Sequence, residues 1–371
     1  MDDLEPRLRQ VLARPLNVPV VEAFLVDVHS GARRRQRRRT AGLATACAIV
    51  LLGASLLFTG ISQRPEPQPA NEQLARIAVG NGPCCVATVG DSIWVLNLRD
   101  STLQQIDPAT NQAAEPVYVN AKVMAPAGDR LLLIDPNLGN LSLFDPATEN
   151  IKPIKGFASR GGNVFDGQSL WLGSTNNGDL VEVDPTSARI LTRMTIPGVP
   201  NYDSMTMASD HELWATTWDG DLIQIDLRNQ EVVRRLRPFP EATDFVSIVA
   251  AGDHLFAVSG QIPRLLRIDQ KTGRITARRP LTLTSPNSFP RLSQQPDGTL
   301  WLMRGPDQID LLDPQTGETQ TTHRVPLTNG HDATQHFAGG IATGFDSLWV
   351  GVWPDALEEG ALVRQPFSTP P

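Results

Sequence analysis

The chain has 371 residues, of which 40% are hydrophobic and 20% are charged, a composition typical of a folded protein that excludes a disordered one. The net charge of −7 is uneven, because residues 1–40 hold nine Arg and five acidic residues (+4) while the remainder holds 24 basic and 35 acidic residues (−11). An acidic main body of this kind excludes a nucleic-acid partner, since it would repel the phosphates.

Residues 1–39 form a basic tail that we expect to lie in the cytoplasm. Residues 2–12 have the pattern of a short amphipathic helix, and Pro15 and Pro19 interrupt it. A tail of this length cannot bury a core of its own. It either lies on the membrane as a topology signal or docks a cytoplasmic partner, and the sequence leaves both roles open.

Residues 40–62 are predicted to cross the cell membrane once as a helix. No charged residue occurs between residues 40 and 63, and roughly 20 apolar or small residues span a hydrocarbon layer about 30 Å thick. Residues 33–39 include six Arg, and such clusters stay on the cytoplasmic side, so everything after residue 62 is expected outside. The long region before the apolar run favours an uncleaved signal-anchor over a cleaved signal peptide.

After a Pro-rich spacer at residues 63–75, one pattern recurs seven times through residues 76–366, and a short tail follows at 367–371. Each copy has an apolar strand, a Gly-Asp-like turn, a strand with one large residue, and a strand closed in most copies by Asp-Pro-x-Thr or a variant of it. The large residue recurs every 38 to 48 positions, at Trp94, Leu132, Trp171, Trp214, Phe256, Trp301 and Trp349. This period predicts an all-β fold, a seven-bladed β-propeller of four-stranded blades.

The recurrent residues are interpreted as structural. The large residues are expected to pack between blades. The closing aspartates are expected to accept hydrogen bonds from their own turns, at Asp107, Asp145, Asp184, Asp226, Asp269 and Asp313. The seventh copy ends before its outermost strand. Residues 76–79, which precede the first copy, have the sequence pattern expected of that strand. We therefore predict that residues 76–79 complete the seventh blade, which leaves no open edge there.

The three Cys residues are too few for a disulfide framework. Cys47 lies in the predicted membrane helix. Cys84 and Cys85 are adjacent, and they either form a vicinal disulfide or fill an inner strand as two small residues.

The repeat Gly-Asp-x-Leu/Ile-Trp-Val, followed by Leu-x-x-Ile-Asp-Pro-x-Thr, resembles the bacterial YVTN and virginiamycin B lyase-like superfamily of seven-bladed propellers over residues 76–365. The tail, helix and propeller together resemble a membrane-anchored actinobacterial form. For the lyases, the resemblance implies metal-assisted elimination by histidines and an acid at the propeller centre. Only His331 and His336 lie near the entry to an innermost strand, whereas His211 and His254 lie at the other end of a blade and His323 on an outer strand.

A ligand is expected where the loops that enter the innermost strands meet those between the second and third strands. Trp218 and Trp353 are the two Trp outside the repeat position, and each either recognises a partner or covers a loop. The predicted ligand-binding residues are Arg160, Tyr202, Asp203, Trp218, Asp244, Arg291, His336 and Trp353. Further residues expected on this rim are Asn97, Arg99, Asp135, Asn137, Asn163, Asn176, Asn177, Asp219 and Arg304.

These features predict a binding, scaffold or sensor module for an envelope protein, peptide or glycan, held by the membrane helix and needing no cofactor. An enzyme is disfavoured, because no Ser/His/Asp order, P-loop, dinucleotide fingerprint or HExxH motif occurs. The alternative is a metal-dependent lyase-like enzyme at the central channel, which requires His331 or His336 with a second ligand. In a third hypothesis the propeller senses and the tail reports across the membrane.

Overall fold

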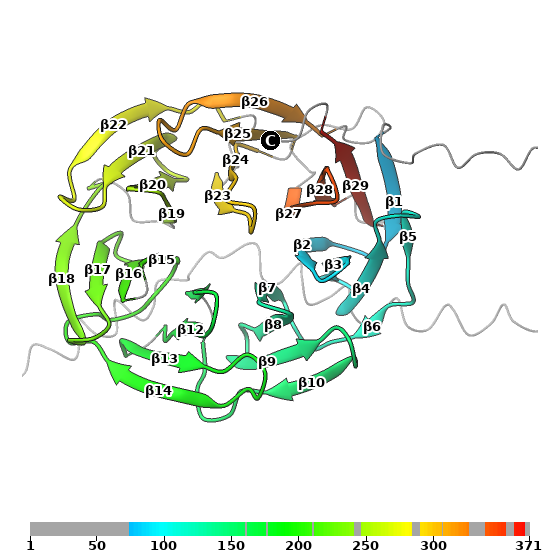
Figure 1. Ribbon diagram of the computed structural model, residues 1–371, viewed down its shortest axis with the longest axis horizontal. Coiled ribbons are helices and arrows are strands. Elements are labelled where there is room, and N and C mark those ends of the chain that lie inside the picture. Colours follow the sequence, from blue (N-terminus) through cyan, green and yellow to red (C-terminus); the bar gives the residue numbers. More distant parts are fainter. Residues whose placement is uncertain are drawn as a thin grey trace, which may run out of the picture. The chain divides into compact units, whose positions relative to one another are not determined.

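The computed structural model describes residues 74–159, 162–175, 177–209, 211–240, 246–283, 290–305, 307–325, 338–353 and 360–367. The predicted tail and the predicted membrane segment at residues 40–62 lie outside these ranges. Within the ranges, no helix is both long and apolar enough to cross a bilayer. The elements are strands, and they form seven sheets arranged in a ring (Figure 1).

The seven sheets are the blades of the predicted propeller, and the first strand of blades 1 to 6 lies nearest the ring centre. Blade 1 consists of β2 (Pro83–Val89), β3 (Ser92–Asn97), β4 (Thr102–Asp107) and a fourth strand split into β5 (Gln112–Ala113) and β6 (Val117–Tyr118). Blade 2 consists of β7 (Val123–Ala127), β8 (Arg130–Asp135), β9 (Asn140–Asp145) and β10 (Asn150–Pro153). Blade 3 consists of β11 (Asn163–Phe165), β12 (Leu170–Gly173), β13 (Asp179–Val183) and β14 (Ile190–Thr195).

The other four blades follow the same order. Blade 4 consists of β15 (Met205–Ser209), β16 (Glu212–Thr216), β17 (Leu222–Asp226) and β18 (Glu231–Leu236). Blade 5 consists of β19 (Val246–Ala251), β20 (His254–Ser259), β21 (Arg264–Asp269) and β22 (Ile275–Pro280). Blade 6 consists of β23 (Arg291–Gln294), β24 (Leu300–Met303), β25 (Gln308–Leu312) and β26 (Thr319–Arg324). Blade 7 consists of β27 (Ala338–Gly344), β28 (Ser347–Val352), β29 (Gly360–Pro366) and β1 (Ala75–Val79).

Strand β1 closes the ring, as the sequence predicts. It pairs antiparallel with β29 from Ala75↔Arg364 to Val79↔Gly360 and so supplies the outermost strand of blade 7. Arg364 strengthens this closure, because its buried guanidinium donates to the Pro108 carbonyl at 2.6 Å and to Asn111 Oδ1 at 2.9 Å, both in blade 1. The two ends of the repeat region are therefore joined by a strand pair and by side-chain hydrogen bonds.

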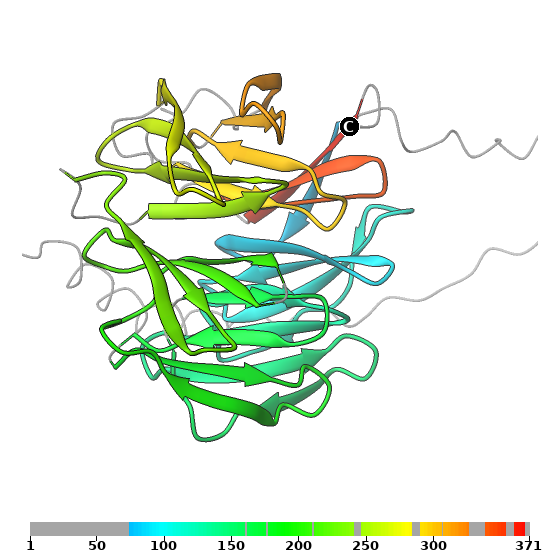
Figure 2. The same ribbon diagram turned by 60° about the vertical axis from the view of Figure 1, so that its left-hand side comes forward.

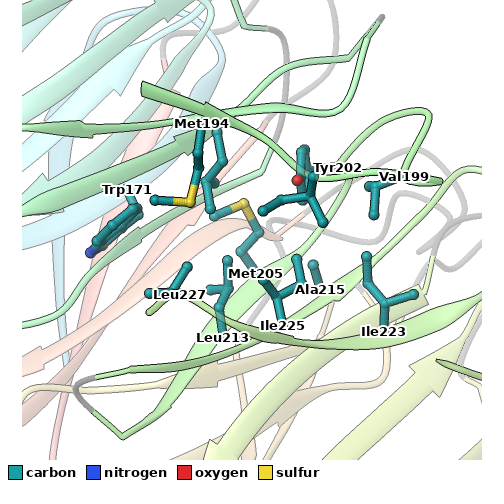
Figure 3. Packing of buried hydrophobic residues seen from close by; sticks show 12 residues of the cluster. Trp171, Met194, Val199, Tyr202, Met205, Leu213, Ala215, Ile223, Ile225 and Leu227 are labelled. Atoms are coloured by element: carbon teal, nitrogen blue, oxygen red, sulfur yellow. The ribbon is translucent and has the colours of Figure 1, made fainter. Parts of the chain in front are cut away.

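The core lies between blades. Within the described residues, the buried apolar side chains form seven clusters, one at each junction of neighbouring blades. Each blade presents alternate residues of its strands to its two neighbours, which is how a sheet buries both faces. Figures 2 and 3 show the packed blades and the junction of blades 3 and 4, where Trp171, Met194 and Met205 meet.

The recurrent large residues are core residues, which confirms the sequence interpretation. Each lies on the second strand of its blade and is at most 6% exposed. Trp94, for example, packs its ring edge-on against Phe144 of the next blade at 5.2 Å between centroids.

The recurrent aspartates are turn residues, which is also as predicted. In each turn one carboxylate oxygen accepts the backbone N–H two residues further on, or, for Asp269, the N–H of Thr272. These bonds hold the carboxyl pKa below its ordinary value, most directly the N–H of Ala109 at Asp107 and that of Thr316 at Asp313.

Candidate ligand-binding face

The turns between the second and third strands of all blades lie at one end of the ring, because consecutive antiparallel strands reverse direction at each turn. The described residues of these turns are 98–101, 136–139, 174–175, 177–178, 217–221, 260–263, 304–305, 307 and 353. The starts of the inner strands lie at the same end. We call this end the rim face, and it is the face on which the sequence predicts ligand binding.

Trp218 is presented on the rim face by a tight turn. The turn closes through Thr217 N–H to Asp221 O at 2.9 Å and Gly220 N–H to Thr217 O at 2.9 Å. The Trp218 backbone N–H also donates to Asn201 Oδ1 at 2.8 Å. Its side chain is nevertheless 49% exposed. The backbone is thus fixed while half of a large aromatic surface faces solvent.

Trp353 occupies a different environment, where the last blade meets the first. Its indole N–H donates to the Pro83 carbonyl at 2.9 Å, and the Arg99 guanidinium lies 5.5 Å from the ring centroid. The structure therefore brings together Trp353 of blade 7 and Arg99 of blade 1, which are 254 positions apart in the sequence. The Trp353 side chain is only partly exposed, and part of its role is to hold the start of β2.

Tyr202 is a core residue, which corrects the prediction that it lies on the rim. Its side chain is fully buried in the cluster of Figure 3, and its hydroxyl donates to Gly178 O at 3.0 Å. Gly173 makes room for the ring, since a Cβ there would lie 2.4 Å from Tyr202 Cβ. Burial, with the charge of Asp179, raises the pKa of Tyr202.

Several polar residues expected on the rim also support the fold. Asn97 is fully buried and donates to Thr102 Oγ1 and Gln104 Oε1, each at 3.2 Å. Asp135 is 5% exposed and caps its own turn. Arg304 pairs with the buried Asp310 at 2.7 Å, and such a pair orders a loop more than it offers a free charge.

The remaining candidates divide by exposure. Asp203 and Asn163 are partly buried, and the Asp203 N–H donates to Thr216 O at 2.9 Å. The exposed ones on the rim face are Arg99, Asn137, Asn177, Asp219 and Arg291. Arg160, Asn176, Asp244 and His336 lie outside the described residues.

The ring of seven sheets is similar to known folds. No family model and no curated protein matches the chain. The structure is similar to the WD40 β-propeller domain of Doa1, with a TM-score of 0.59 and 11% identity over 79% of this chain and 96% of that one. It is also similar to hydrazine synthase of Kuenenia stuttgartiensis, with a TM-score of 0.57 and 14% identity over 76% and 98%. The fold is a seven-bladed β-propeller. At these identities the likeness shows the fold alone.

The propeller presents an exposed residue on the rim face that the sequence interpretation missed. Leu138 is 67% exposed in the turn of blade 2. Asp135 Oδ1 accepts the backbone N–H of Asn137 at 3.0 Å and that of Leu138 at 3.4 Å, which fixes this turn. The signal was present, since an Asp-Pro-Asn-Leu-Gly turn places an apolar residue where turns usually carry polar ones.

A cleft of about 450 Å³ between blades 3 and 4 was also missed. Its polar lining includes Asp166, His211 and Arg228, from the turns at the end of the propeller opposite the rim face, and Glu182 of β13. The Glu182 oxygens accept the Ser169 and Thr192 hydroxyls, each at 2.8 Å, so this carboxylate is used within blade 3. No sequence pattern links the lining residues, because the two blades contribute them from five separate segments.

The histidines of the described segments do not assemble a catalytic set. His323 packs against Trp301 and Phe367 on the outer strand of blade 6, and burial lowers its pKa. In the part of the chain that the structure describes, no three His, Cys, Asp or Glu side chains gather as a metal site. His331 and His336, on which the lyase alternative depends, lie outside that part.

Proposed function

We propose that this chain is a binding module, acting as a scaffold or sensor, whose rim face recognises an envelope protein, peptide or glycan. The single observation that carries the proposal is Trp218, a half-exposed indole on a turn whose backbone is fixed by Asn201. Rigid aromatic surface binds partners with little loss of conformational entropy, and Trp is enriched among residues that dominate binding energy.

The chemistry of the rim face suits a polar partner with an apolar or ring face. Leu138 adds a second exposed apolar side chain on the rim face, and Asn137, Asn177 and Asp219 add exposed hydrogen-bonding groups. Peptides and glycans both combine a stackable surface with many hydrogen-bonding groups, which indole and amide side chains can match. The net charge of −11 after residue 40 favours neutral or basic ligands over polyanions.

We propose further that residues 40–62 hold this module on the outer side of the cell membrane, in an arrangement like that of anchored actinobacterial envelope proteins. The uncharged run and the six Arg before it support this proposal. Full-length protein is expected to resist alkaline carbonate extraction, whereas a variant without residues 40–62 is released. External protease on intact cells should remove the propeller of the full chain. Protection of the propeller in the intact cells would contradict the proposed orientation.

Site-specific photocrosslinking in intact cells tests the binding role. A photoreactive amino acid replaces Leu138 or Asp219 on the rim face, and Leu191, which is 57% exposed on the outer strand β14, is the matched control. We expect one shared product from both rim positions and none from Leu191, and we expect Trp218→Ala to abolish it. Equal products from all three positions, or a product that survives Trp218→Ala, would contradict the role of the rim face.

A further inference from the structure

Cys84 and Cys85 lie on the same side of an inner strand, although consecutive strand residues normally point to opposite faces. The cause is a β-bulge at the start of β2. Pro83 pairs with Asn97 and Cys85 with Leu96, so Cys84 is the extra residue that has no partner across the strand. The two sulfur atoms consequently lie 3.1 Å apart. Both side chains are half-buried and both are free thiols.

The neighbouring blades accommodate this bulge. A Cβ at Gly340 of β27 would lie 3.0 Å from both the Cys84 carbonyl oxygen and the Cys85 Cα. Blade 7 can therefore pack against the bulge only because this position is glycine. On the other side the Cys84 sulfur lies 3.7 Å from the carbonyl oxygen of Lys122, which precedes β7. The pair thus sits among the inner strands of blades 7, 1 and 2, at the rim-face end of the channel.

The surroundings of the pair favour one thiolate. The pKa of Cys85 is lowered, first because the Cys84 thiol can donate to its sulfur, and further by the Met124 N–H and the positive charge of Arg291. The pKa of Cys84 is raised by its hydrogen bond to Cys85 and by burial. Cys85 is therefore the sulfur that ionises first, and the thiolate is the nucleophile in disulfide exchange. Arg291 comes from the inner strand of blade 6, so its charge acts across the channel.

We propose that Cys84 and Cys85 form a reversible redox dithiol that reacts with small-molecule or protein disulfides. The Cys85 thiolate attacks one sulfur of the disulfide RSSR, forms a mixed disulfide and releases one thiolate, which takes up a proton. Cys84 then loses its proton and attacks the Cys85 sulfur, which releases the second RSH. The two cysteines lose two electrons and two protons in total, and RSSR becomes two RSH.

The geometry suits a reversible pair better than a permanent crosslink. The sulfurs need to approach by only about 1 Å to reach the ~2.05 Å of a bond. Adjacent Cα atoms are about 3.8 Å apart, closer than the 4.4–6.8 Å usual for disulfides, so the ring is strained and easily reduced. The preceding residue, Pro83, accepts the Trp353 indole N–H, which places the dithiol next to the rim face.

The test uses full-length protein in detergent with Cys47→Ser, which leaves only these two thiols. Reduced protein is equilibrated with oxidised glutathione, alkylated and weighed by intact-mass spectrometry. We expect loss of both alkylatable thiols without a bound glutathione. With Cys84→Ser added, a glutathione adduct should accumulate on Cys85. With Cys85→Ser instead, the adduct at Cys84 should form at least about tenfold more slowly at pH 7. Arg291→Gln should slow the reaction of the intact pair about threefold.

Thermal unfolding of each variant shows that the compared proteins are folded. Two free thiols at equilibrium in folded protein, or two glutathione adducts without ring closure, would overturn the dithiol. Equal rates for the two single-Cys variants would overturn the assignment of Cys85 as the attacking sulfur. None of these results bears on ligand binding at Trp218, which photocrosslinking tests separately.

Discussion

At the residue scale, the same side-chain type has opposite roles at two positions four residues apart. Trp214 is fully buried between blades 4 and 5, whereas Trp218 is 49% exposed on the next turn. Their positions relative to strand β16 explain the difference in exposure. Trp214 lies within β16 on a face that packs against blade 5, and Trp218 follows the end of that strand at Thr216.

Substituting these two Trp separates stability from recognition. Trp214→Ala should lower the free energy of unfolding by about 3–5 kcal/mol, because it leaves a cavity in a packed junction. Trp218→Ala should lower it by less than about 1 kcal/mol, because half of the side chain is already in water. Urea titration followed by circular dichroism measures both. A large loss in Trp218→Ala would mean that this indole is structural, and that loss of the crosslinked product in this variant reports on folding.

Arg364 is a single buried side chain that joins blade 7 to blade 1 where the ring closes. It is 1% exposed, stacks on Trp349 at 4.9 Å, and donates to Ser347 Oγ as well as to Pro108 O and Asn111 Oδ1. Its five donors in a planar fork reach several acceptors at once, which an ammonium group cannot do.

Arg364→Met should therefore lower the free energy of unfolding by about 3 kcal/mol or more, because buried acceptors in blades 7 and 1 lose their donors. Arg364→Lys should recover only part of this loss. Gln365→Met, one position along the same strand and partly exposed, is the matched control. The prediction is wrong if Arg364→Lys unfolds at the same urea concentration as the unsubstituted protein.

At the element scale, the recurrent turn repeats a single electrostatic arrangement. In six turns an aspartate carboxylate accepts hydrogen bonds from the residues that follow it, and its pKa is lowered in each. A carboxyl whose folded-state pKa lies below its unfolded value of about 3.9 contributes stability above that value. The contribution is lost as the pH falls through the folded-state pKa. The propeller should therefore lose stability below about pH 4.

Asp313→Asn tests this link between turn and pH. The amide oxygen can still accept the N–H groups of Gln315 and Thr316, but it carries no charge and does not titrate. The fall in thermal midpoint between pH 7 and pH 3 should be smaller in this variant than in the unsubstituted protein. Asp91→Asn, an exposed carboxylate outside these turns, should leave the fall unchanged. An unchanged fall in Asp313→Asn would show that titration of this carboxylate does not contribute to the loss of stability in acid.

The sequence predicted the elements better than the site, for a physical reason. Core Trp, turn Asp and the closing strand recur with a period, and each copy supports the interpretation of the others. Tyr202 and Asn97 occur once, and their burial depends on room left by Gly173 and Gly80, which only the packed blades reveal. The contact of Arg99 with Trp353 and the bulge at Cys84 likewise depend on how blade 7 meets blade 1.

At the scale of the whole molecule, six junctions join blades that are neighbours in sequence, and the seventh joins blades from the two ends of the repeat region. That junction contains Ile77 and Val79 of β1, Trp349 and Leu362 of blade 7, and Val95 of blade 1. Closing so long a loop costs more conformational entropy than forming a junction between blades that are neighbours in sequence. The stability of the ring should therefore depend strongly on β1.

Ile77→Asp in the full-length chain tests this dependence. Ile77 is 6% exposed and pairs with Leu362, so an unpaired carboxylate there should lower the free energy of unfolding by about 3 kcal/mol or more. Release of β1 would also leave β29 as an open edge, so the variant should self-associate. Ala78→Asp is the matched control, because Ala78 is on the same strand but faces solvent. Urea titration and light scattering measure the two effects. If both variants unfold at the same urea concentration and stay monomeric, β1 does not hold the ring closed, and the closure depends instead on Arg364 and on the junction residues outside β1.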